Sequence, residues 1–232
     1  MFYGLFYDPT YVLVILAFVL SLIASFGVQT TFARYKKERT SRGVTGADAA
    51  RRILDMNGLY KIRIERVSGS LTDHYDPSAN VIRLSDSTYN DDSVAAVGVA
   101  AHEAGHAVQH AVGYVPIKIR NAIVPVVNIG TQLSMPLFFI GLIFGITNLA
   151  YLGIVLFSLA LVFQIITLPV EINASRRAIR ILDESNLLQE DEIKPAKKVL
   201  GAAAMTYVAA VAATALQLLR LIILVGGRRR ND

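Results

Sequence analysis

The sequence predicts a mainly α-helical membrane protein with three or four transmembrane helices and a small cytoplasmic α+β segment. Two observations support this fold class. The 232-residue chain is 53% hydrophobic and only 18% charged, which is too apolar for an ordinary water-soluble domain. Three long stretches contain no charged residue or histidine, while residues 34–120 have an ordinary polar composition. A plain water-soluble globule is therefore excluded.

The uncharged stretches are each long enough for a bilayer crossing of about 20 residues. The first lacks the basic start of a cleaved signal peptide, so we interpret it as a retained anchor. The second is long enough for two spans and is interrupted near 145–148, which predicts a helical hairpin. Pro125 and Pro136 should kink the first arm of this hairpin. The three stretches are residues 9–33, 121–170 and 199–219.

Lysine and arginine residues indicate the orientation, because they accumulate on the cytoplasmic side of membrane proteins. Five of them lie between residues 34 and 42, and three arginines follow the hairpin. Residues 34–120 and the segment after the hairpin are therefore expected in the cytoplasm. Arginines 228–230 break this pattern if residues 199–225 cross the membrane. That segment either forms a fourth span or packs on the protein and ends at the membrane interface.

The sequence pattern of residues 34–120 predicts a helix, then a small sheet, then a longer helix. Thr45 and Asp48 resemble a capping box ahead of a helix over 46–57. The stretches YKIRIERV and DHYDPSANVIRLSD, with a turn inside the second, predict a small antiparallel sheet whose edge could receive an extended peptide. Asn90, Asp91 and Asp92 are expected to begin a helix that runs to Gly113.

This longer helix carries a metal-binding pattern. His102 and His106 are four residues apart, so both imidazoles project from one helix face and can bind one Zn²⁺ ion. Glu103, between them, can reach a water on the metal and act as general base. The alternative is a chance spacing, but two histidines and a glutamate buried in so apolar a helix would be costly without an ion or partners.

A catalytic zinc site needs a third protein ligand, and the absence of cysteine excludes a thiolate. His110 lies about 6 Å further along the helix axis than His106 and does not converge on the same ion. For His74 the sequence leaves three roles open: a metal ligand, an ordinary turn residue, or a donor on the substrate side. Glu171 is the stronger candidate, because it is the first charged residue after the hairpin, which returns the chain to its starting side. The alternative is a solvated carboxylate at the end of a membrane helix.

The H-E-x-x-H pattern at 102–106, the hairpin, and Glu171 opening E-I-N-A-S-R-R-A resemble the gluzincin membrane proteases such as the HtpX-like and CAAX prenyl proteases. The chain is most similar to the YugP-like bacterial neutral zinc metallopeptidases, over nearly its whole length. This resemblance implies zinc on His102, His106 and Glu171, and peptide hydrolysis with Glu103 as base. Ser175 stands where the HtpX-like group usually has an aspartate that supports the site.

The sequence therefore predicts a multi-pass membrane zinc metallopeptidase whose site faces the cytoplasm and whose substrates are peptides or membrane proteins. Tyr207 and Arg177 are candidate oxyanion donors, although a helical tyrosine is more often packing and an arginine beside a membrane more often a topology signal. The expected parts are an anchor (1–33), a zincin-like segment (34–120), a transmembrane hairpin (121–170), and a third-ligand segment with an apolar helix (171–232).

Three other function classes have less support in the sequence. The basic excess lies beside the apolar stretches, so it indicates membrane orientation, and no nucleic-acid partner is expected. A non-catalytic membrane zinc-binding or transport protein is disfavoured because transporters place ionisable residues inside several spans, whereas the hairpin has none. An assembly subunit with a spent site remains an alternative that metal analysis and a peptidase assay would distinguish.

Overall fold

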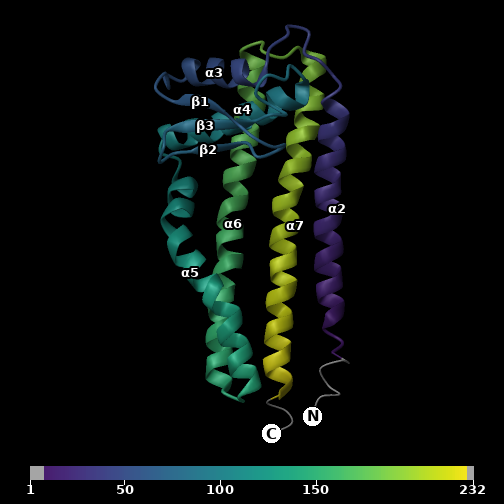
Figure 1. Ribbon diagram of the computed structural model, residues 1–232, viewed down its shortest axis with the longest axis vertical. Helices are drawn as coiled ribbons and strands as arrows, with labels where there is room; N and C mark the ends of the chain where they lie inside the picture. Colours follow the sequence, from purple (N-terminus) through teal and green to yellow (C-terminus); the bar gives the residue numbers. More distant parts are fainter. Residues whose placement is uncertain (1–7, 229–232) are drawn as a thin grey trace. The chain divides into compact units, whose positions relative to one another are not determined.

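A computed structural model describes residues 8–228. It is mainly helical, with a small three-stranded sheet (Figure 1). The chain divides into two compact units: unit 1 comprises Met1–Ser25, Ile119–Leu168 and Thr206–Asp232, and unit 2 comprises Phe26–Lys118 and Pro169–Met205. The elements in chain order are α2 (Tyr11–Tyr35), α3 (Gly46–Met56), β1 (Arg63–Val67), β2 (His74–Asp76), β3 (Val81–Ser85), α4 (Val94–Ala111), α5 (Val115–Ile143), α6 (Thr147–Glu184) and α7 (Glu190–Arg228).

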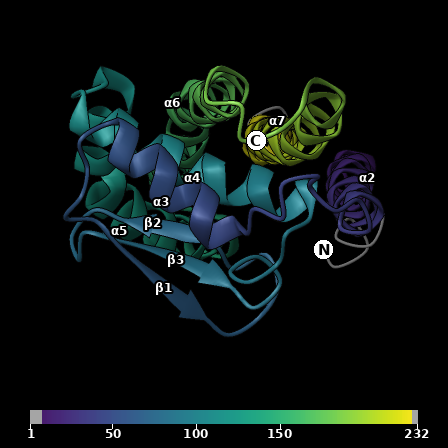
Figure 2. The ribbon, with the colours of Figure 1, turned by 90° about the horizontal axis from the view of Figure 1, so that it is seen from above.

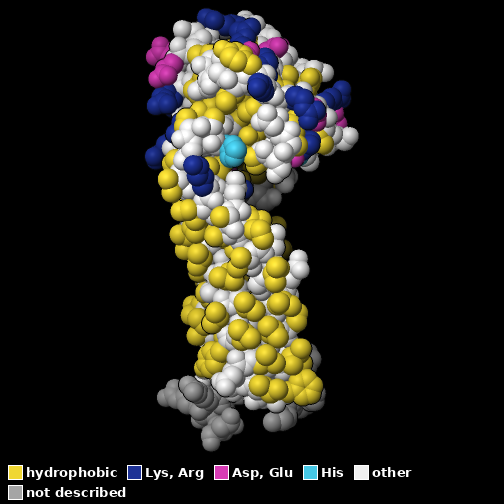
Figure 3. Space-filling view, turned by 90° about the vertical axis from the view of Figure 1, so that its left-hand side faces the viewer, with side chains coloured by type: hydrophobic (Ala, Val, Ile, Leu, Met, Phe, Trp, Pro, Cys, Tyr) yellow, Lys and Arg dark blue, Asp and Glu magenta, His cyan; other side chains and the backbone are white. Residues whose placement is uncertain are grey.

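Unit 1 consists of the apolar parts of four helices. By length and composition, α2, α5, α6 and α7 are each able to cross a membrane. Large apolar side chains are exposed on all four of them, and Figure 3 shows many apolar side chains on the face of this unit that it displays. So much contiguous apolar surface requires a lipid or protein environment. The predicted anchor and hairpin thus coincide with candidate spans, and α7 adds a fourth.

A tight turn joins α5 to α6 at the predicted break in the second apolar stretch. Gly145 adopts a φ of 69° in this turn, a conformation that favours glycine. A Cβ atom at Gly141 would lie 2.3 Å from the Ala150 nitrogen, so glycine lets the two helices pack closely. Pro125 and Pro136 lie inside α5, which bends along its length in Figure 1.

Arg220 directly follows the last apolar stretch and lies within the α7 candidate span, and it is neutralised within unit 1. Its guanidinium lies 3.2 Å from a carboxylate oxygen of Asp8 and 4.7 Å from the ring centroid of Tyr11. Ionisable residues in membrane helices are generally paired in this way because an unpaired charge is costly in lipid. The arginine is therefore compatible with α7 as a candidate span.

The sheet of unit 2 is mixed, with the strand order β1-β3-β2. The β2-β3 pair is antiparallel, as predicted from the turn at residues 77–80. The pairing of β1 with β3 is parallel, so the prediction of an all-antiparallel sheet is wrong for β1. The chain leaves β1, crosses to the far edge to form β2, and returns between the two as β3. This crossover depends on tertiary packing, which residue alternation does not report.

Two capped helices cover the sheet. Helices α3 and α4 lie against one of its faces (Figure 2). The predicted capping box of Thr45 and Asp48 is present at the start of α3. At α4 the cap is Ser93, whose hydroxyl accepts a hydrogen bond from the Ala96 backbone N–H at 3.2 Å, so the predicted start at residues 90–92 is corrected. Asp91 instead accepts from the Ser93 backbone N–H at 2.9 Å and thereby shapes the turn before the helix.

The core of unit 2 forms where α4 packs against α3, α6 and α7. Small side chains of α4, including Ala100, Ala101 and Ala104, are completely buried there. A Cβ atom at Gly105 would lie 2.8 Å from the carbonyl oxygen of Ala174 on α6. The absence of a side chain at Gly105 therefore permits the close approach of α4 to α6.

We expect Gly105→Ala to lower the free energy of unfolding by about 1–3 kcal/mol, as overpacking does. Gly98→Ala on the same helix is the matched control, because its Cβ would meet nothing nearer than the Ala196 Cβ at 3.9 Å. The control should be neutral or stabilising by up to about 1 kcal/mol, since alanine favours helices. Denaturation of both full-length variants in one detergent gives the comparison, and equal effects would contradict the close approach.

Candidate metal centre

Three side chains from two helices converge in unit 2. The Nε2 atoms of His102 and His106 on α4 lie 3.2 and 3.3 Å from one carboxylate oxygen of Glu171 on α6. One potential ligand atom from each residue lies within 4.8 Å of the others. The two imidazole rings are nearly perpendicular, with an interplanar angle of 83°. The three side chains therefore offer two nitrogen donors and one oxygen donor to a common point.

This arrangement fits a zinc ion. Zinc bonds of about 2.0–2.1 Å in tetrahedral geometry place neighbouring donor atoms about 3.3–3.4 Å apart. The two measured nitrogen–oxygen separations of 3.2 and 3.3 Å are close to this spacing. Two histidines and one glutamate are also a donor set found in catalytic zinc sites, in which the fourth position stays open. The cluster of His102, His106 and Glu171 could thus hold a zinc ion.

Burial sets the electrostatics of this cluster. Only 3% of the Glu171 side chain is exposed, compared with 13% for His102 and 10% for His106. Burial alone would lower the pKa of His106, but its hydrogen bond to Glu171 and the negative charges of Glu103 and Glu171 outweigh this effect and raise the pKa. The raised pKa favours the protonated imidazole, and zinc binding opposes this protonation, since histidine binds metal in its neutral form.

Each imidazole is oriented by a hydrogen bond to its second ring nitrogen. His106 Nδ1 lies 3.0 Å from Gln109 Oε1, and His102 Nδ1 lies 3.1 Å from the hydroxyl oxygen of Ser175. When the Nε2 atoms bind a metal, the Nδ1 atoms carry the protons and donate them to these oxygens. Ser175 therefore contacts a candidate ligand at the position where the HtpX-like group usually has an aspartate.

Gln109 is a residue that the sequence analysis missed. It is fully buried, and its Nε2 donates hydrogen bonds to the Val170 carbonyl at 2.8 Å and to Asn173 Oδ1 at 2.9 Å. It thus links His106 to α6 on both sides of Glu171. The available signal was a glutamine three residues after His106, on the same helix face. Its importance depends on contacts with α6 such as that with Val170, which is 61 residues further along the chain.

The other predicted site residues occupy different places. Glu103 is buried on α4, and its charge acts on His106. His74 is exposed on β2, where its Nδ1 donates to the Thr72 carbonyl at 2.9 Å, outside the three-ligand cluster. Arg177 donates from Nε to Asn173 Oδ1 at 2.8 Å and lies 6.0 Å from the ring centroid of Tyr114. Tyr207 belongs to unit 1.

We expect Gln109→Leu to weaken zinc binding by about 10- to 100-fold, the usual cost of losing a residue that orients a metal ligand. Leucine is similar in size to glutamine but cannot accept a hydrogen bond from His106 Nδ1. Gln189→Leu is the control, because the Gln189 side chain lies outside the cluster of ligands. Competition with a calibrated chelator measures the affinity, and unchanged binding by Gln109→Leu would show that the hydrogen bond does not position His106.

Comparison with known proteins identifies the family of the chain. A family described as "putative neutral zinc metallopeptidase" matches residues 10–226. A relative named "Putative membrane protease YugP", from Bacillus subtilis (strain 168), is 48% identical over 220 residues, which cover 94% of this chain and 98% of the relative. No solved structure matches the chain. The match extends over both units, so the chain belongs to this family of neutral zinc metallopeptidases.

Proposed function

We propose that this protein is a membrane-embedded zinc endopeptidase that hydrolyses peptide bonds at the cytoplasmic face of the membrane. One observation carries the proposal: two imidazoles and a carboxylate converge at the spacing of a tetrahedral zinc site, beside the buried Glu103. The family description and the relative's name support the same reaction class. The four candidate spans support action at a membrane.

The ligand residues His102, His106 and Glu171 would hold the ion and leave one position open to solvent or substrate. When bound, zinc supplies a Lewis acid that polarises a scissile carbonyl and makes a water molecule more acidic. Glu103 would accept the proton of the attacking water and later transfer it to the leaving nitrogen. Ser175 and Gln109 would fix the two imidazoles in the orientation that metal binding requires.

The substrate is proposed to bind as an extended chain along β2. This strand pairs with β3 on one side, and no strand pairs with its other side within residues 8–228. Tyr75 of β2 contacts the His110 ring of α4 at a centroid distance of 6.2 Å, so the open edge runs near the ligand helix. A peptide can add to such an edge through backbone hydrogen bonds. His74 lies on this strand, but its Nδ1 proton already bonds to the Thr72 carbonyl, so it is not assigned the role of a substrate-side donor.

The cytoplasmic placement is supported by charge distribution. The basic residues between 34 and 42 follow the first candidate span, and Arg176, Arg177 and Arg180 follow the apolar part of α6. Both clusters belong to unit 2, which holds the site. Arg177 and Tyr207 remain candidates for stabilising the oxyanion. The proposed substrates are peptides or membrane proteins, because the candidate spans would keep the site close to the bilayer.

We expect Glu103→Gln to retain zinc and to lower the rate of peptide hydrolysis by about 100- to 10,000-fold, the usual contribution of a general base. Glu184→Gln is the control, since the Glu184 side chain is 67% exposed and lies outside the ligand cluster. Cleavage of an unfolded protein substrate and the zinc content are measured on the same detergent-purified samples.

Three outcomes would contradict parts of the proposal. Full turnover by Glu103→Gln would exclude this residue as the base. Loss of zinc together with loss of activity would indicate a structural role for Glu103. A wild-type protein that binds zinc but cleaves no substrate would favour a non-catalytic zinc-binding protein.

A further inference from the structure

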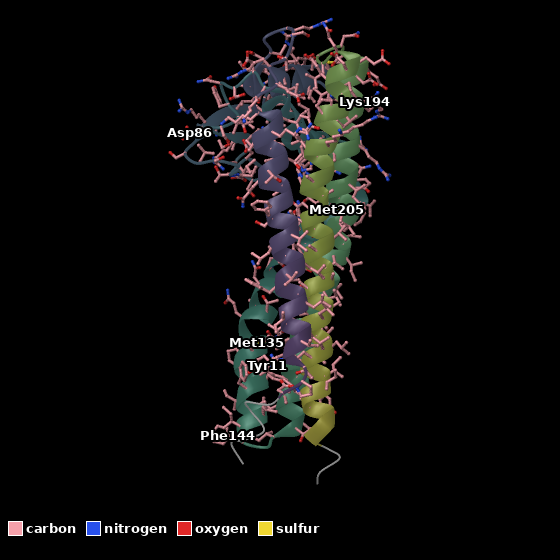
Figure 4. All side chains as sticks on the ribbon, turned by 90° about the vertical axis from the view of Figure 1, so that its right-hand side faces the viewer. Tyr11, Asp86, Met135, Phe144, Lys194 and Met205 are labelled. Carbon is pink, nitrogen blue, oxygen red and sulfur yellow. The ribbon has the colours of Figure 1, made fainter. Side chains whose placement is uncertain are left out.

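A groove in unit 2 lies outside the metal-ligand cluster, and the proposed reaction does not use it. Its cavity volume is about 480 Å³. One wall comes from α6 between residues 172 and 183, and the other from α7 between residues 197 and 204. Figure 4 labels Lys194 and Met205, which lie just beyond the two ends of the α7 wall. The groove is therefore formed where both helices continue into their apolar stretches.

Each wall changes from apolar to basic along its length. On α6, Ile172 lies next to the apolar stretch that ends at residue 170, and Arg176 and Arg180 follow further along. On α7, Lys197 comes before the apolar stretch that begins at residue 199, and Gly201 lies inside that stretch. Both walls are thus apolar on the side of the candidate spans and charged on the other side.

The charged end of the groove is suited to an anion. It presents Arg176, Arg180 and Lys197 against a single acidic residue, Asp183. Within residues 8–228, Arg176 and Lys197 form no ion pair, and Arg180 has only the exposed Glu184 at 3.9 Å. Exposed ion pairs of this kind contribute little. Basic pockets beside membrane helices are typical sites for anionic lipid headgroups.

We propose that this groove binds an anionic phospholipid from the leaflet that faces unit 2. The phosphate would contact Arg176, Arg180 and Lys197, and an acyl chain would lie against Ile172 and Gly201. A small soluble anion would leave the apolar walls in water, and a zwitterionic lipid would not match the net positive charge. The inference rests on the candidate membrane spans and does not depend on peptide hydrolysis.

The groove also touches the metal centre through one residue. Ser175 lines the groove, and its hydroxyl oxygen lies 3.1 Å from His102 Nδ1. A lipid in the groove would therefore contact the side chain that orients a candidate zinc ligand. This contact provides a direct physical route by which lipid composition could change zinc affinity.

Native mass spectrometry of the full chain, titrated in detergent with phosphatidylglycerol or phosphatidylcholine, tests the proposal. We expect phosphatidylglycerol to bind at least about tenfold more tightly, a preference worth about 1.4 kcal/mol. The double variant R176Q/K197Q should lose this preference. The matched control K194Q/K198Q removes two exposed charges of α7 that lie outside the groove, and it should bind as the wild type does.

A second variant tests the shape of the groove without changing its charge. A Cβ atom at Gly201 would meet no atom within 4 Å, so Gly201→Leu can fill the groove without straining the helix. We expect this variant to bind phosphatidylglycerol at least about tenfold more weakly, with unchanged zinc content and thermal stability. Equal binding of the two lipids by the wild type, wild-type binding by both groove variants, or displacement by inorganic phosphate alone would overturn the proposal.

Discussion

The close approach of α4 to α6 places a buried carboxylate against two imidazoles, and the metal centre depends on this contact. Gly105 permits the approach because a side chain there would collide with the Ala174 backbone. The Glu171 side chain is almost completely buried, and an isolated charge in such a place would be strongly unfavourable. The two histidines contact this carboxylate at 3.2 and 3.3 Å, and a zinc ion bound to the three residues would compensate the charge. Gln109 reinforces the contact, since it bonds to His106 and to the backbone of α6.

Local patterns in the sequence predicted much of this site, and long-range packing determined the rest. The pair His102 and His106 follows from the helical period, and Glu171 from the position of the first charge after the apolar hairpin. The parallel pairing of β1 could not be predicted, because alternation of side chains does not specify which strand lies between the others. Ser93 precedes its helix directly and was overlooked in favour of the acidic residues before it. The role of Gln109 depends on its hydrogen bonds to α6, which the local sequence does not show.

Helix α6 contributes to both units and carries the candidate third ligand. It is continuous from Thr147 to Glu184 and carries apolar residues in unit 1 and the third ligand in unit 2. Asn173 and Ser175, which follow Glu171 on the same helix, support the two histidines. The proposed lipid groove uses another face of this segment and shares Ser175 with the site. One helix thus contains both a candidate membrane span and the candidate third metal ligand.

X-ray absorption spectroscopy at the zinc edge of the zinc-loaded protein tests the central claim most directly. The spectrum of the wild type should contain outer-shell scattering from two imidazoles and a first shell of nitrogen and oxygen at about 2.0–2.1 Å. The Glu171→Ala variant should keep the imidazole scattering but lose one protein oxygen ligand and bind zinc more weakly. Zinc bound without histidine scattering, or an identical spectrum and affinity after Glu171→Ala, would contradict a site shared between α4 and α6.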